Sequence, residues 1–265
     1  MNTLTMVTPA ALRRGWLGAL FAGERRLALF GLVMVLAMLP ALVALGLDER
    51  MLRGVNVWVK PLKFMASLAL FAWTTAWCVG LLPAARRRSR AVAVVAWTIV
   101  VAGSFEIVYI TLQAALGEAS HYNVGDPLHG GLYTLMGAAA LLMTATQPLL
   151  AWQIHRHGRP EVPLLLRRAV VAGLVATFVL GAGAGGLLGG LQPPPGAGLP
   201  VVGWHLLGDL RPAHFLGMHA QQLLPLAGWV FLQRGGGPAL LVFSAAYGAL
   251  WVVAMGCGLA LGPPG

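Results

Sequence analysis

Charged residues are scarce in this chain of 265 residues: only 10% are Asp, Glu, Lys or Arg, whereas 58% are hydrophobic. A soluble domain carries about a quarter charged residues, so this composition cannot cover a water-facing surface. The apolar residues also cluster in blocks long enough to cross a hydrocarbon core, which takes about 20 helical residues. The shortage of charge excludes a soluble domain and makes the lipid bilayer the first expected partner.

Acidic residues are fewer still, with 8 Asp and Glu against 18 Lys and Arg, giving a formal net charge of +10. An excess of positive charge can indicate nucleic-acid binding. Here the basic residues occur in short clusters between the apolar blocks, which is the pattern that sets membrane topology. The sequence therefore predicts no nucleic-acid partner.

Cysteine and internal repeats are also lacking. The two cysteines, Cys78 and Cys257, fall at opposite ends of predicted membrane helices, too far apart for a disulfide. Both are interpreted as small apolar packing residues. No internal repeat is visible, so the inverted halves of many transporters are not indicated.

The apolar blocks predict an all-α polytopic membrane protein with seven transmembrane helices. The first block follows Arg25 and Arg26 and is too long for the apolar core of a signal peptide, so it is expected to remain as an anchor. Residues 1–26 are expected to form a cytoplasmic arm with a short interfacial helix, and residues 27–265 the membrane domain. The predicted spans are 27–47, 62–83, 91–116, 130–153, 164–190, 213–233 and 238–261.

The distribution of arginine predicts the orientation. Thirteen of the 18 basic residues fall in the N-terminal arm, the second-to-third loop, the fourth-to-fifth connection and the sixth-to-seventh loop. Positive charge favours the cytoplasmic side, so the N-terminus is expected inside, the C-terminus outside, and the protein in a bacterial inner membrane. In span five, Gly181, Gly185 and Gly189 lie one turn apart, a spacing that lets two helices approach closely.

The start of span two holds the only two lysines of the chain, Lys60 and Lys63, on the side where positive charge is sparse. They follow Asn56 and the interfacial residue Trp58. One interpretation is that the lysines snorkel to the membrane surface. The other is that Asn56, Lys60 and Lys63 bind an anionic group of a lipid or small-molecule substrate.

Span three carries an acidic residue deep in the membrane. Glu106 lies eleven residues before Gly117, roughly 16 Å along a helix and close to the expected midplane. An ionisable residue at that depth is a candidate for function by default. Tyr109 and Gln113 follow on the same face and extend a polar stripe toward the outer surface. The alternative is a neutral Glu106 that joins helices by hydrogen bonds.

The approach to span six is polar as well, with Asp209, Arg211, His214, His219 and Gln222 within one short stretch. His214 and His219 are five residues apart, about 140° around a helix, so they cannot chelate one metal by themselves. Five of the seven histidines fall on the predicted outer side. His214, His219 and Asp209 are expected to converge in one pocket with His121, and His129 is a further candidate for it. A transition metal or haem is one candidate cofactor there. The candidate metal ligands are His121, His129, His214 and His219.

These segments resemble a bacterial multi-pass membrane family without an assigned activity. The shared patterns are Asn-x-Trp-x-Lys-Pro-x-Lys-Phe from Asn56, Glu-x-x-Tyr-x-x-x-Gln from Glu106, and Gly-Asp-x-Arg-x-x-His-Phe-x-Gly-x-His from Gly208. A weaker likeness is to seven-span metal-dependent hydrolases of the alkaline ceramidase and progestin/adiponectin receptor type. That likeness implies catalytic roles for Ser67 and Asp209 beside Glu106, although the histidine spacing is one residue too long.

Three functional interpretations follow from the sequence. The first is a membrane enzyme or redox protein with a metal or haem in the outer half of the bundle. The second is a transporter or channel-like protein in which Glu106, Gln113 and His219 line a path for protons or a solute. The third is a structural or sensing module. Retinal-binding proteins are excluded, because span seven has no lysine for a Schiff base.

Overall fold

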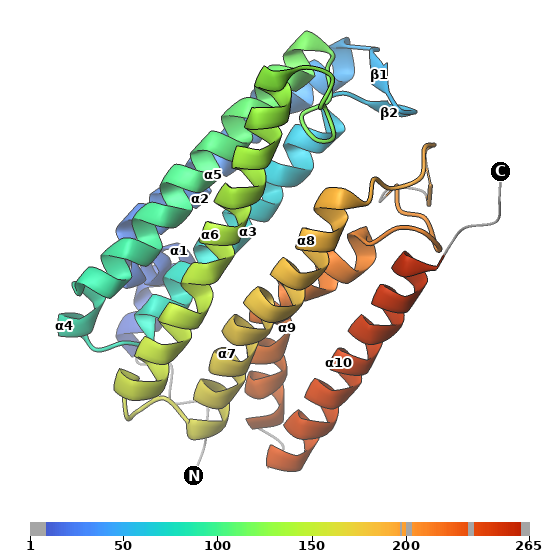
Figure 1. Ribbon diagram of the computed structural model, residues 1–265. Coiled ribbons are helices and arrows are strands. Elements are labelled where there is room, and N and C mark those ends of the chain that lie inside the picture. Colours follow the sequence, from blue (N-terminus) through green and yellow to red (C-terminus); the bar gives the residue numbers. More distant parts are fainter. Residues whose placement is uncertain (1–8, 197, 200–202, 233–235, 261–265) are drawn as a thin grey trace.

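A computed structural model describes residues 9–196, 198–199, 203–232 and 236–260, which Figure 1 shows as a bundle of long helices with one small hairpin. Residues 1–8 of the predicted arm, Arg234, and the end of the predicted seventh span lie outside the described residues. In chain order the elements are α1 (Pro9–Gly23), α2 (Arg25–Leu47), β1 (Met51–Leu52), β2 (Val55–Asn56), α3 (Val59–Gly80), α4 (Ala84–Arg87), α5 (Arg90–Leu116), α6 (Pro127–His157), α7 (Leu164–Ala176), the π-helix η2 (Thr177–Ala182), α8 (Gly183–Gly190), α9 (Arg211–Leu232) and α10 (Gly237–Leu259).

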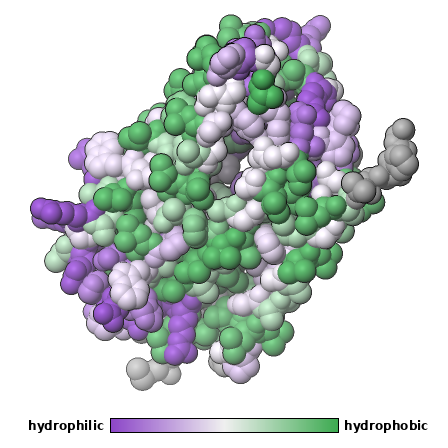
Figure 2. All heavy atoms as spheres, in the orientation of Figure 1, coloured by the Kyte–Doolittle hydropathy of each residue, from purple (hydrophilic) through white to green (hydrophobic). Residues whose placement is uncertain are grey.

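Six helical segments of the described chain are long and apolar enough to cross a membrane: α2, α3, α5, α6, the continuous run α7–η2–α8, and α10. Figure 2 shows hydrophobic side chains over the middle of one face and hydrophilic ones toward its ends. A helix satisfies its backbone hydrogen bonds internally, which is what a lipid environment requires. These features support an all-α integral membrane protein.

The helix α9 lies among the others in Figure 1 but is not one of the six apolar segments. Its 22 residues include Arg211, two histidines and two glutamines, which reduce its apolar character. The predicted sixth span is therefore present as a helix. The same polar residues that suggested a functional site make α9 less apolar than the other six segments.

The helix boundaries lie within four residues of the predicted spans. The largest difference is at α6, which continues to His157. It begins at Pro127 because the Asp126 carboxylate accepts hydrogen bonds from the backbone of Leu128 and His129, which caps the helix. At the end of α5, Gly117 adopts the left-handed conformation that closes a helix, with φ 77°.

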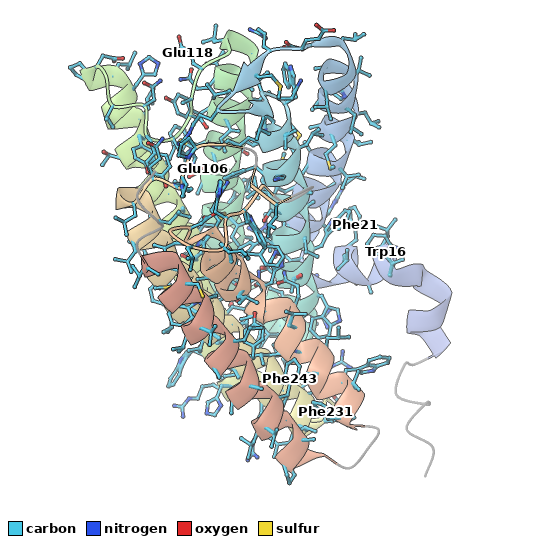
Figure 3. The ribbon with its side chains drawn as sticks, turned by 90° about the vertical axis from the view of Figure 1, so that its right-hand side faces the viewer. Trp16, Phe21, Glu106, Glu118, Phe231 and Phe243 are labelled. Carbon is cyan, nitrogen blue, oxygen red and sulfur yellow. The ribbon has the colours of Figure 1, made fainter. Side chains whose placement is uncertain are left out.

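In the predicted N-terminal arm, residues 9–23 form α1, which is broken by a kink at Gly15, where φ is 60°. Figure 3 shows α1 projecting sideways from the bundle, with Trp16 and Phe21 on it. The Trp16 ring meets the Trp73 ring of α3 edge to face, with 5.4 Å between centroids, and Trp16 remains 63% exposed. At the C-terminal end of α1, a Cβ on Gly23 would collide with the Ala76 carbonyl, so the backbones of α1 and α3 are in contact there. The side chains of residues 9–14 lie outside the described part.

Glycine brings η2 and α9 into backbone contact. A Cβ at Gly217 would lie 2.4 Å from the Gly181 nitrogen, closer than any real side chain permits. The predicted packing role of Gly181 is thus confirmed. A Cβ at Gly185 would meet the His214 ring at 3.0 Å, and one at Gly189 would only approach the Tyr133 hydroxyl at 4.0 Å. The two cysteines are both free, as the sequence indicated.

The antiparallel strands β1 and β2 lie at the same end of the bundle as the last turn of α5 (Figure 1), and we call this the hairpin end. The Asn56 amide donates to the Asp48 carbonyl, while its side-chain oxygen accepts from the Trp58 backbone. The Trp58 indole donates to the Asp48 carboxylate at 2.8 Å. Asn56, a predicted substrate-binding residue, therefore holds the turn that starts α3.

Candidate functional site

Lys60 and Glu106 form the centre of the candidate site. The Lys60 ammonium group, in the first turn of α3, and the Glu106 carboxyl group of α5 are close enough to attract each other electrostatically. Figure 3 shows Glu106 inside the bundle and Glu118 at its end. Glu106 is only 4% exposed, and its Oε1 atom has no hydrogen-bond partner within the described residues. A buried carboxyl oxygen without a partner is costly, so this position is open to a further hydrogen-bonding group.

The polar stripe predicted on α5 is buried along its length. Tyr109 is 7% exposed and Gln113 is 2% exposed. The Gln113 amide donates to the Ala119 carbonyl at 3.2 Å and approaches Glu118 at 3.5 Å. Gln113 therefore holds the loop that follows α5, whereas the Tyr109 hydroxyl makes no hydrogen bond among the described residues.

His121, in the loop between α5 and α6, packs between two aromatic rings. Its ring centroid lies 5.8 Å from that of Phe64 and 5.5 Å from that of Tyr133, and Nδ1 lies 3.3 Å from the Ser120 hydroxyl. Burial, followed by the nearby Lys60 charge, lowers the pKa of His121 to about 3. The ring is therefore neutral at physiological pH and can accept or donate one hydrogen bond.

The two histidines of α9 have different surroundings. His214 Nδ1 lies 2.9 Å from the Gly181 carbonyl of η2, which can only accept, so this nitrogen carries the proton. The His219 ring packs against Phe215 at a tilt of 48°, with 4.1 Å between centroids. One turn further, the Gln222 amide donates to the Thr74 hydroxyl at 3.0 Å and links α9 to α3.

The bundle also buries polar residues that were not predicted to belong to the site. Gln147 of α6 and Gln221 of α9 are fully buried, and the Gln147 side-chain oxygen and both side-chain polar atoms of Gln221 have no partner within the described residues. Thr177 of η2 is also fully buried and accepts a hydrogen bond from the Gln221 backbone at 3.0 Å. The sequence interpretation missed Gln147, Gln221 and Thr177, although amides inside apolar spans were a visible signal.

His129 has separate partners at the hairpin end. Its Nδ1 lies 2.5 Å from the Asp126 carboxylate, and its Nε2 lies 3.4 Å from that of Glu118. Hydrogen bonds from the His129 backbone and ring lower the pKa of Asp126. His129 is thus fixed by two carboxylates near the start of α6.

The histidines do not assemble into a metal centre. In the described part of the chain no three His, Cys, Asp or Glu side chains are placed to hold a metal ion. The physical reason is that each ring already faces its own partner: a backbone carbonyl for His214, aromatic rings for His121 and His219, carboxylates for His129. The predicted set of His121, His129, His214 and His219 is therefore not placed to hold one metal ion together within the described residues.

Asp209 and Arg211 form a clamp at the start of α9. Arg211 donates to both carboxylate oxygens of Asp209 at 2.7–3.0 Å and to the Gly203 carbonyl at 2.7 Å. The backbone of His205 and of Arg211 donates to the same carboxylate. Burial raises the pKa of Asp209, but these hydrogen bonds outweigh it and the net shift is downward. Both oxygens are occupied, which suits a structural role better than the predicted catalytic one.

The remaining predicted residues lie along α3. Ser67 and Lys63 are exposed, and Ser67 is therefore not enclosed in a catalytic pocket. Lys63 is close enough to Arg211 for their charges to repel each other. Arg211 adds little positive charge to that of the two lysines, because Asp209 neutralises it.

A comparison of the chain with protein-family models, with curated proteins and with solved structures gives no match.

Proposed function

We propose that the chain is a seven-span protein of a bacterial inner membrane, with the N-terminus inside and the C-terminus outside. The arginine-rich connections support this orientation. The position of α9 among the other helices supports its role as the additional span. We also propose membership of the multi-pass family that shares the Asn56, Glu106 and Gly208 patterns.

We further propose that the protein conducts protons through the bundle. The observation that carries this proposal is that several helices of the bundle hold buried polar side chains, Glu106 on α5, Gln147 on α6 and Gln221 on α9, with Lys60 half-buried at the start of α3. Several of their polar atoms have no partner within the described residues. In lipid such atoms are costly unless water or a solute satisfies them.

Lys60 and Glu106 suit this function. Their charges attract each other without forming an ion pair among the described residues, and a carboxyl group with an ammonium group nearby can bind and release a proton without leaving a lone charge in the membrane. His214 and His219 lie beyond them on α9, and imidazole can both accept and donate a proton. Thr74 of α3 and Gln222 of α9, which are joined by a hydrogen bond, provide two further hydrogen-bonding side chains. The path is thus made of groups that exchange protons or hold water.

The test is proton flux into liposomes that contain the purified protein and a pH-sensitive dye, driven by a potassium diffusion potential. We expect flux above that of protein-free liposomes, and at least a tenfold loss in Glu106→Gln. The matched control is Glu161→Gln, because Glu161 is 65% exposed and lies in the connection between α6 and α7. Absence of flux in the wild type, or undiminished flux in Glu106→Gln, would contradict the proposal.

A further inference from the structure

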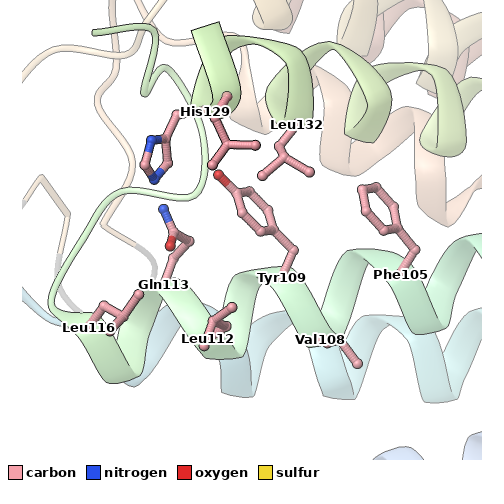
Figure 4. A pocket seen from close by; sticks show the side chains of 9 residues that line it. Phe105, Val108, Tyr109, Leu112, Gln113, Leu116, His129 and Leu132 are labelled. Carbon is pink, nitrogen blue, oxygen red and sulfur yellow. The ribbon is translucent and has the colours of Figure 1, made fainter. Parts of the chain in front are cut away.

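A groove on the surface of α5 and α6 is separate from the proposed proton path. It has a volume of about 380 Å³ and runs along the outer half of α5, with Phe105 at one end and His129 at the other. Figure 4 shows the side chains of both helices that line it. Its apolar walls include Val108, Leu112 and Leu128, which are 65%, 53% and 68% exposed and so face the lipid.

One polar group points into this groove without a partner. Tyr109 is only 7% exposed, and its hydroxyl makes no hydrogen bond within the described residues. Figure 4 shows the ring of Tyr109 directed from α5 toward α6, near His129 and Leu132. A buried hydroxyl has one proton to donate, and lipid-facing walls offer no water to accept it. The groove therefore suits an occupant that is apolar along its length and carries an acceptor at this depth.

The mouth of the groove is acidic in a chain that is otherwise basic. Glu118 and Asp126 flank His129 there, and both carboxylates remain about half exposed, at 50% and 49%. Two carboxylates with one imidazole between them leave the mouth with negative charge. They would repel an anionic head group and attract an ammonium group.

The Tyr109 hydroxyl and the two carboxylates at the mouth lie at different depths, and their separation suits a phospholipid. Tyr109 lies eight residues before Gly117, roughly 12 Å along α5 from the end where Glu118 follows. The polar region of a bilayer is about 5–8 Å thick on each side, and the ester carbonyls lie beneath the terminal group of the head. Figure 4 shows the Tyr109 side chain extending from α5 back toward that end, so its hydroxyl lies nearer to Glu118 than its backbone does. A phospholipid whose ammonium group reaches Glu118 thus brings its ester carbonyls to the level of this hydroxyl.

We infer that the groove is a binding site for an aminophospholipid of the phosphatidylethanolamine type. One acyl chain lies along Val108 and Leu112, an ester carbonyl accepts the hydrogen bond of the Tyr109 hydroxyl, and the ammonium group binds Glu118 and Asp126. This site holds a lipid beside the helix that carries Glu106, whatever the protein conducts.

The test is native mass spectrometry of the detergent-purified full chain, equilibrated with equal amounts of phosphatidylethanolamine, phosphatidylcholine and phosphatidylglycerol that share the same acyl chains. We expect the ethanolamine lipid to be retained at least threefold over the choline lipid, because the trimethylated head has no N–H to donate. Mono- and dimethylated ethanolamine lipids should fall between the two. Equal retention of the ethanolamine and choline lipids, or preference for phosphatidylglycerol, would overturn the inference.

Two sets of variants locate the site. Glu118→Gln combined with Asp126→Asn should bring the ratio of ethanolamine to choline lipid to about one, and asparagine still caps α6. Glu161→Gln should leave the ratio unchanged. Leu112→Trp fills the groove and should reduce retention of the ethanolamine lipid, whereas Val101→Trp, on the exposed surface of α5 outside the groove, should not. A preference that survives both the double variant and Leu112→Trp would place the lipid elsewhere.

Discussion

Replacement of Gly217 by alanine tests the close contact between α9 and η2. The added Cβ would lie 2.4 Å from the Gly181 nitrogen and 2.5 Å from its Cα, whereas an ordinary contact is 3.4–4 Å. Helix α9 must then move about 1 Å from η2, an overpacking that costs about 1–3 kcal/mol. Alanine also favours a helix over glycine by about 0.5–1 kcal/mol, which offsets part of this cost. We expect net destabilisation.

The assay is the midpoint of thermal unfolding in detergent, compared with Gly248→Ala. A Cβ at Gly248, within α10, meets nothing within 4 Å, so this control keeps only the gain in helix propensity and should melt slightly above the wild type. Gly217→Ala should melt below it. If both variants melt at or above the wild type, the contact between η2 and α9 is not as close as described.

Three further predictions concern the hairpin end and the topology. Asp209→Asn should destabilise the protein by about 1–3 kcal/mol, because Arg211 loses its charged acceptor, and the unfolding midpoint will measure this. Stability should fall as the pH drops from about 7 to 4, because the unfolded state protonates His121 near pH 6.5 while burial keeps its pKa at about 3 in the fold. His121→Gln should flatten that dependence of the midpoint on pH, and an unchanged slope would reject the assignment. In a cysteine-free background, Val124→Cys should react with an impermeant maleimide in intact cells and Ala85→Cys should not; the reverse pattern would invert the proposed topology.

Six of the helical segments could be predicted because each contains an apolar run long enough to cross a membrane. The prediction was least informative at α9. Its polar residues fit both a functional site within a transmembrane helix and a helix that does not cross the membrane. The sequence also does not show which face of α9 contacts the neighbouring helices.

The candidate site was predicted in part. Glu106, Tyr109 and Gln113 were identified because an acidic residue and its helical neighbours stand out in an apolar run, and all three are buried. The approach of Lys60 to Glu106 could not be predicted, because the two residues lie on helices far apart in the chain. Asp209 shows the limit of such prediction most clearly: the sequence suggested a catalytic role, whereas in the fold its carboxylate is held in an ion pair with Arg211.

The π-helix η2 fixes the length of the chain between α7 and α8. A π-helix holds one residue more than an α-helix of the same hydrogen-bonded span, so deletion of one residue from Thr177–Ala182 would restore a regular helix. All of α8 would then rotate by about 100° relative to α7. The Leu188 and Gly189 carbonyls, which accept the hydroxyls of Tyr122 and Tyr133, would turn away from them. The hydrogen bonds of Tyr122 and Tyr133 thus depend on the one additional residue in η2. A deletion there would alter the surroundings of His121 although His121 itself is unchanged.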